Sequence, residues 1–365
     1  MRRISQVPRS RLRRRVRRES RPLLLSVLVA TVVVAAVILA LRFEPLAVGK
    51  HFEPAAQVSL LLDGSFSARF AGEMVATRQG FFDSNVTLRA EPNDSDFVAT
   101  VAREHAIGVT SGQNFLLAAW RGVPVTAFAA SFLDTSTVIF TLESSGLRRP
   151  ADLVGKRVGY RKASEGDVIF DAMMAQLGLP RSQITKVPDR DTFDALRAGE
   201  VDAIIAAVGQ EPRPSEPGDV RLNAIKPEQY ALHVPGMVYF ARSDLVHDRP
   251  SAVAQVLEGI IKGWQFVYSD YARSVPVLVS FDPERLKSDR VKFELQQQRR
   301  LILPTGGRIA DYDESRWRTL RDILIFAKLG EETVPLAQSV DYQFLRDVYR
   351  RSPNLAAPGT WPADR

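Results

Sequence analysis

The sequence predicts an α/β fold with two lobes, each built on a doubly wound sheet, behind one N-terminal transmembrane helix. Three observations carry this prediction. Residues 151–208 show the pattern β-α-β-α-β, residues 57–130 repeat the same alternation, and the run Leu23–Leu41 contains no charge. Short apolar strands that alternate with amphipathic helices are typical of a sheet covered by helices on both faces.

The segment 151–208 predicts one complete lobe. Its helix 164–177 begins at Ser164, a good N-cap, and ends at Gly178, a typical C-cap. The run 201–208 is almost wholly apolar, which fits a parallel strand buried on both faces. The strands expected here are 156–160, 184–187 and 201–208, and the helices are 164–177 and 191–198.

The other lobe is predicted from the segments on either side of this unit. Apolar stripes at helical spacing, such as the one from Val253 to Val267, indicate long helices after residue 250. The expected strands are 57–62, 85–90, 106–109, 124–130 and 236–241. The expected helices are 68–79, 97–103, 115–120, 253–267, 283–301, 313–328 and 339–350.

The N-terminus predicts a membrane segment. Residues 1–21 hold ten Arg and one acid, and without them the chain has 39 basic and 41 acidic residues. The remainder is therefore not basic, which argues against nucleic-acid binding. A 19-residue uncharged helix reaches about 28 Å, enough to span a bilayer core. Because Lys and Arg stay on the cytoplasmic side, the rest of the chain is expected outside, and cleavage near Ala47-Val48-Gly49 is the alternative.

These patterns predict a division into six parts. The expected parts are a basic arm 1–21, a membrane segment 22–41, a tether 42–56, a first lobe 57–135 with 235–350, a second lobe 136–234, and a flexible tail 351–365.

The sequence shows no catalytic or metal-binding constellation. The four His are not spaced as metal ligands, and Gly155-Lys156 lacks the flanking residues of a phosphate loop. There is no Cys, which removes thiolate ligands and Cys nucleophiles. We therefore expect no enzyme activity, metal or cofactor, and a cleft that binds a small molecule.

Five segments, taken in order, resemble a known family. They are Leu60-Leu61-Leu62-Asp63 with Phe70-Ala71-Gly72, Gly80-Phe81-Phe82, Ala151-Asp152-Leu153-Val154-Gly155-Lys156, Ala195-Leu196-Arg197-Ala198-Gly199 to Ala203, and Lys262-Gly263-Trp264. Together they are similar to the periplasmic substrate-binding proteins of ABC importers, in the group that binds nitrate, sulfonate, taurine and the thiamine pyrimidine precursor. The resemblance implies a type II-like two-lobed fold, a monomer that closes on a ligand, and delivery to a transmembrane permease.

The chain departs from the pyrimidine-precursor branch at one place. That branch shows Asp-Trp after the first strand and an Asn three residues later, whereas here Gly64 follows Asp63 and Ser67 replaces the Asn. Phe66 is the aromatic residue left to stack on a ring. The eukaryotic relatives that make the pyrimidine use a Cys-rich segment. Because this chain has no Cys, that activity is not carried over.

Ligand groups are expected at the carboxyl ends of strands and at helix N-termini. The candidates in the first lobe are Asp63, Ser65, Phe66, Ser111, Gly112, Gln113, Asn114, Ser131 and Phe132, and those in the second are Lys162, Ser164, Glu165, Asp167, Gln210 and Glu211. Helix capping alone also accounts for Ser111, Asn114 and Ser164, the helix dipole for Glu165 and Asp167, and core packing for Phe66.

The carboxylates Asp63 and Glu211, each directly after an apolar strand, favour a ligand with amino donors, such as an aminopyrimidine or an amine. Three alternatives stay open: a sulfonate or nitrate binder, a membrane-anchored sensing or accessory domain without an importer, and an enzyme on the same scaffold.

Overall fold

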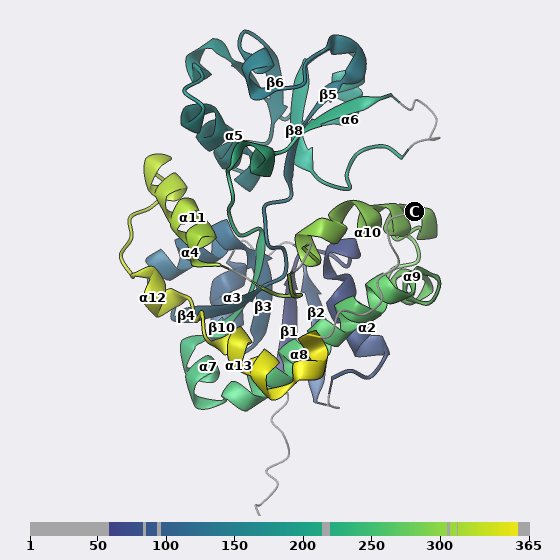
Figure 1. Ribbon diagram of the computed structural model, residues 1–365, viewed down its shortest axis with the longest axis vertical. Coiled ribbons are helices and arrows are strands. Elements are labelled where there is room, and N and C mark those ends of the chain that lie inside the picture. The colour runs from purple at the N-terminus through teal and green to yellow at the C-terminus, as the bar shows by residue number, and fades with distance from the viewer. Residues whose placement is uncertain are drawn as a thin grey trace, which may run out of the picture. The chain divides into compact units, whose positions relative to one another are not determined.

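The computed structural model describes residues 58–82, 85–92, 96–213, 220–304, 307–311 and 313–356 (Figure 1). The chain divides into Met1–Ala56 and Gln57–Arg365, and all the described residues belong to the second unit. The predicted arm 1–21, membrane segment 22–41 and tether 42–56 lie outside the described residues. Within the described ranges, no helix is both long enough and apolar enough to cross a membrane.

The first sheet has five strands in the order β2-β1-β3-β10-β4. Its strands are β1 (Val58–Asp63), β2 (Val86–Glu91), β3 (Ile107–Ser111), β4 (Val125–Ala130) and β10 (Met237–Arg242). β10 runs antiparallel to both of its neighbours, while β1, β2 and β3 are mutually parallel. Leu60, Leu61 and Leu62 of β1 are all fully buried, because helices cover both faces of this sheet.

The second sheet has the same kind of order, β7-β6-β8-β5-β9. Its strands are β5 (Thr137–Leu142), β6 (Arg157–Tyr160), β7 (Thr185–Pro188), β8 (Ala203–Ala207) and β9 (Leu222–Ile225). β6 pairs in parallel with β7 and β8, and β5 runs antiparallel to β8 and β9. The predicted β-α-β-α-β unit is therefore present as β6, α5, β7, α6 and β8.

The helices pack against the two sheets. On the first sheet they are η1 (Ala68–Phe70), α2 (Ala71–Arg78), α3 (Phe97–Arg103), α4 (Gly112–Trp120), α7 (Ser243–Asp248) and α8 (Pro250–Ser269). The second sheet carries α5 (Glu165–Gln176) and α6 (Phe193–Arg197). The last helices are α9 (Tyr271–Val279), α10 (Ser288–Ile302), α11 (Glu314–Phe326), α12 (Leu336–Ser339) and α13 (Phe344–Arg351). In Figure 1, α10 and α11 lie on opposite sides of the region between the two sheets.

The structure moves several helix starts and adds elements; α4 and α8 each begin three residues earlier than expected. The helix expected over 283–301 begins at Ser288, because Lys287 is still extended. The helix expected over 339–350 begins at Phe344, because Val340 leaves the helical path and forms a bridge with Ala127 of β4. The strands β5 and β9 and the helices α7 and α9 were not predicted.

Two connections join the sheets, and they touch at residues 132–136 and 233–236. The backbone N–H of Gly236 donates to the carbonyl oxygen of Phe132 at 3.0 Å. A Cβ atom at Gly236 would overlap with the backbone carbonyl of Asp134, so only glycine allows this approach. The side chain of Arg316 on α11 donates to both carboxylate oxygens of Asp134, at 3.1 and 3.2 Å, and His233 Nδ1 lies 3.1 Å from Asp134 Oδ1. The carboxylate of Asp134 thus holds both connections against α11.

Replacement of Arg316 by alanine is expected to lower the free energy of unfolding by about 2 kcal/mol, because Asp134 would lose a bidentate partner in a mostly buried position. The matched control is Arg318→Ala on the same helix. Arg318 pairs with Glu314, but both side chains are more than half exposed, so that change should cost about 0.5 kcal/mol or less. Denaturant unfolding of the two variants measures the difference, and equal costs would contradict the role of Asp134.

Candidate functional site

A cavity of about 420 Å³ lies between the two sheets. Side chains and backbone from both lobes line it: Asp63, Arg69, Ser111, Gln113, Asn114, Ser136, Arg161, Ala163, Ser164, Glu165, Gly236 and Met237. Six of these were candidates from the sequence: Asp63, Ser111, Gln113, Asn114, Ser164 and Glu165.

The first sheet presents its groups at the carboxyl ends of neighbouring parallel strands. Asp63 ends β1 and Ser111 ends β3, so both reach the same edge of the sheet. The hydroxyl of Thr110 donates to Asp63 Oδ2, and the Asn114 amide lies 3.5 Å from the same oxygen. Ser111 also caps α4, accepting from the Asn114 N–H at 3.1 Å. Ser111 therefore both caps α4, as predicted, and lines the cavity.

The second sheet presents the N-terminus of α5. Ser164 caps this helix by accepting from the Asp167 N–H at 3.3 Å. Glu165 follows it and accepts a hydrogen bond from the Thr135 hydroxyl at 2.9 Å. Burial raises the pKa of Glu165 to about 7, although the Thr135 bond and the charge of Arg69 oppose the shift. Near neutral pH this carboxyl is therefore present in both protonation states.

Arg69 supplies a positive charge that the sequence did not point to. Among the described residues it has no hydrogen-bond or ion-pair partner, while its guanidinium stacks over the Phe70 ring at 5.2 Å. Desolvation by the surrounding protein lowers the pKa of Arg69, and the charges of Asp63, Glu165 and Glu294 oppose that effect. The side chain is solvent-exposed within the cavity, so the guanidinium stays charged and available to an acceptor.

Gln113 places an unsatisfied acceptor at the cavity. The residue is 6% exposed, and its Oε1 has no hydrogen-bond partner among the described residues. A buried amide oxygen without a partner is costly, so a ligand with an N–H or O–H donor would stabilise this position.

Glu211 and Gln210 lie away from this lining. The Gly209 N–H donates to the Glu211 carboxylate at 2.7 Å, and Arg290 of α10 donates to the Glu211 backbone oxygen at 2.7 Å. Burial raises the pKa of Glu211. Gln210 accepts from the Ala207 N–H at 2.9 Å. Glu211 thus belongs to a contact between the second lobe and α10, whereas Gln210 is exposed and bonds within its own lobe.

Four other candidates of the first lobe have structural partners. Phe66 packs against Phe281, with ring centroids 5.0 Å apart. Phe132 is a core residue, and buried Ser131 lies 3.2 Å from the Tyr239 hydroxyl. Gly112 is buried beneath Pro235, and a Cβ atom there would lie 2.9 Å from the Pro235 oxygen.

The last three candidates are close in sequence to lining residues but do not line the cavity themselves. Ser65 follows the Asp63-Gly64 turn without lining the cavity. Lys162 is exposed in the turn before α5. Asp167 pairs with Lys186 and accepts from the Ala163 N–H at 3.2 Å. Asp167 thus lies in the first turn of α5, the position at which the helix dipole favours a carboxylate.

Six lining residues were not candidates from the sequence: Arg69, Ser136, Arg161, Ala163, Gly236 and Met237. Ser136 precedes the unpredicted strand β5, whereas Gly236 and Met237 stand at the start of β10. Arg161 and Ala163 lie in the turn before α5. Arg69 lies one residue beyond the predicted helix start at Ala68. A cation in the first turn of a helix opposes the dipole, and that oddity was the available signal.

The two α/β lobes, joined by two connections and enclosing a polar cavity, define the periplasmic-binding-protein fold. The family model described as NMT1/THI5 like matches residues 67–273, and the chain belongs to this family. The periplasmic aliphatic sulphonate binding protein SsuA from Escherichia coli superposes with a TM-score of 0.64 at 16% identity, over 79% of this chain and 92% of that one.

Two curated relatives are similar in sequence. A putative thiamine biosynthesis protein of Haemophilus influenzae is 24% identical over 64% of this chain and 76% of its own length. A 4-amino-5-hydroxymethyl-2-methylpyrimidine phosphate synthase of Schizosaccharomyces pombe is 27% identical over 35% of this chain and 38% of its own length.

Proposed function

We propose that this chain is an extracytoplasmic solute-binding protein that captures a small organic ligand between its lobes and delivers it to an ABC importer. One observation carries the proposal: charged and polar groups of both lobes, Asp63 and Arg69 from one and Glu165 from the other, line one cavity. A ligand held there would contact both lobes and thereby favour their closed arrangement. The periplasmic sulphonate-binding neighbour supports this role and the extracytoplasmic location.

The preferred ligand is an aminopyrimidine of the thiamine-precursor type or a related amine. The cavity offers the carboxylates of Asp63 and Glu165 and the unsatisfied oxygen of Gln113 as acceptors for N–H groups. Glu165 thus takes the part that the sequence had assigned to Glu211. The relative named for thiamine biosynthesis supports the same chemistry.

An organic or inorganic anion, such as a sulfonate or nitrate, is the second candidate. Arg69 and the N-termini of α4 and α5 face the cavity, and both features attract negative charge. An anion would, however, also face Asp63 and Glu165. We therefore rank the amine-bearing ligand first.

We infer binding rather than catalysis. Two curated relatives are named as synthases, but the similarity spans only 38% and 49% of their lengths. No Cys occurs in this chain, and no His is among the described residues that line the cavity. The proposal includes the predicted anchor at residues 23–41 and a permease partner. Reconstitution with the permease distinguishes import from sensing, because only an import protein should stimulate transport by the permease.

Native mass spectrometry of the gently purified full-length chain tests the proposal. We expect a co-purified small molecule with at least one N–H donor, released intact on unfolding. A bound alkanesulfonate without such a donor would select the anion-binding alternative, and conversion of the released molecule by the protein would select the enzyme.

Replacement of Asp63 by Asn should weaken binding of 4-amino-5-hydroxymethyl-2-methylpyrimidine about tenfold, because a charge-assisted hydrogen bond is lost. Calorimetric titration of the full-length chain measures the dissociation constant. The matched control is Asp248→Asn, an exposed position at the end of α7, which should bind like the wild type. Equal affinity of wild type and Asp63→Asn would show that Asp63 does not contact the ligand.

A further inference from the structure

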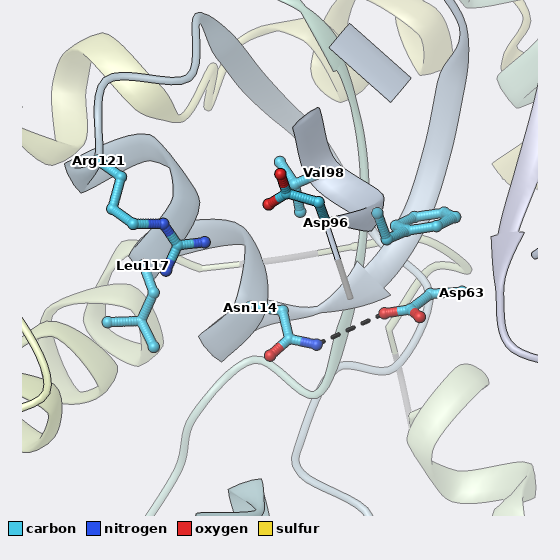
Figure 2. Close-up of a pocket in the computed structure, with 7 residues that line it drawn as sticks. Asp63, Asp96, Val98, Asn114, Leu117 and Arg121 are labelled. Atoms are coloured by element: carbon cyan, nitrogen blue, oxygen red, sulfur yellow. Dashed lines mark hydrogen bonds between the residues drawn. The ribbon is translucent and has the colours of Figure 1, made fainter. Parts of the chain in front are cut away.

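A second cavity, of about 270 Å³, adjoins the first and lies wholly within the first lobe. It is lined by Asp63, Asp96, Phe97, Val98, Asn114, Leu117 and Arg121 (Figure 2). These residues come from the end of β1, the start of α3 and one face of α4. The second cavity is therefore formed without any residue of the other lobe.

Asp63 and Asn114 line both cavities and form the partition between them. Figure 2 shows the Asn114 amide directed at the Asp63 carboxylate, with its nitrogen 3.5 Å from Oδ2. A hydrogen bond of that length is weak, so rotation of the exposed Asn114 side chain costs little. A ligand held at Asp63 is thus separated from the second cavity by one movable side chain.

The second cavity has a polar end and an apolar wall. Figure 2 shows the Asp96 carboxylate and the Arg121 guanidinium directed into the same space. Phe97 and Val98 are buried residues that form the apolar side together with Leu117. Asp63 and Asp96 outnumber Arg121, so the lining carries an excess of one negative charge.

We propose that the second cavity is a subsite for a further moiety of the ligand, positively charged or bearing N–H donors, linked to the part that occupies the interlobe cavity. This inference rests on the proposed function, because it requires the first moiety to lie at Asp63. Its consequence is specificity: the protein prefers two-part ligands to a single aminopyrimidine ring.

A matched pair of probes tests this preference. The short probe is 4-amino-5-hydroxymethyl-2-methylpyrimidine, and the long probe is thiamine, in which the aminopyrimidine carries a positively charged thiazolium ring. We expect the full-length wild type to bind thiamine more tightly. Asp96→Asn should weaken thiamine binding about fivefold and Arg121→Gln should strengthen it about threefold, because the two charges act on the thiazolium with opposite signs.

The short probe keeps the test specific. Both variants should bind it within about twofold of the wild type, because neither residue lines the interlobe cavity. Asp248→Asn controls for a change of net charge, and an unchanged melting temperature controls for folding. The subsite is supported if the two variants change the affinity for thiamine in opposite directions and leave the affinity for the short probe unchanged.

The contrary outcomes separate this inference from the proposed function. If the short probe binds but thiamine binds no more tightly, or both variants shift thiamine in the same direction, the subsite is excluded and the proposed function stands. If neither probe binds the wild type, the aminopyrimidine ligand is excluded, and the subsite inference fails with it.

Discussion

Replacement of Gly263 by alanine is expected to lower the free energy of unfolding by about 3 kcal/mol or more, because a Cβ atom at this position meets backbone. Gly263 lies on α8 where this helix packs against α2. The added atom would lie 2.8 Å from the carbonyl carbon of Gly72 and overlap with its oxygen. Neither backbone can move aside without separating the two helices.

The sign of this effect distinguishes packing from helix propensity. In an exposed helix, glycine to alanine stabilises by about 1 kcal/mol, the opposite of the expected result. Lys262→Ala, the neighbouring exposed position on the same helix, should be close to neutral. Denaturant unfolding of both variants measures the two effects. A Gly263→Ala variant as stable as the wild type would mean that α2 and α8 do not approach as closely as described.

The apolar patterns predicted most of the elements because those patterns are local. The stripe from Val253 to Val267 predicted α8, and its members are buried in the core of the first lobe. Ser164 and Gly178 marked the two ends of α5 through capping, which depends only on neighbouring residues.

The missed strands depend on partners that are distant in the chain. β5 pairs on one side with β8 and on the other with β9, and each pairing joins residues more than 60 positions apart. The start of α13 was displaced for a related reason: Val340 leaves the helical path to meet Ala127. Local periodicity contains no information about such pairings.

The candidate site could be predicted in part for the same reason. Asp63, Ser111 and Ser164 were found because strand ends and helix starts are local signals. Glu211 satisfied the same local rule, yet α10 approaches this segment and its carboxylate turns to the Gly209 N–H. A cation in a first helical turn marks Arg69 as unusual, but its place at the cavity depends on the packing of η1 against the distant helix α10.

Glu73 should make the stability of the wild type fall as the pH rises from 5 to 8. Its carboxyl is fully buried in the first lobe beside Gly72. The Tyr239 hydroxyl donates to its Oε1 at 2.7 Å, while Oε2 has no partner among the described residues. Burial raises the pKa of Glu73 to about 7, against the opposing effect of the Tyr239 bond.

The direction follows from the two pKa values. The folded protein holds the proton more tightly than the unfolded chain, whose Glu has a pKa of about 4.3. The stabilisation from this group is therefore fully present below pH 4.3 and is lost as the pH rises through 7. The loss amounts to about 3 kcal/mol at pH 8, from a shift of between two and three pKa units at about 1.4 kcal/mol each.

Glu73→Gln removes this dependence, because glutamine does not titrate and its oxygen still accepts from Tyr239. At pH 5 the variant should be less stable than the wild type by about 1–3 kcal/mol, because its amide buries two unpaired N–H donors where the protonated acid buries one O–H. At pH 8 the buried carboxylate is ionised, which destabilises the wild type. The difference in the free energy of unfolding between the wild type and Glu73→Gln should then vanish or reverse. Glu331→Gln, the same change at an exposed position, corrects for general effects of pH. If the stability difference between the wild type and Glu73→Gln is constant from pH 5 to pH 8, the buried carboxyl does not titrate in this range.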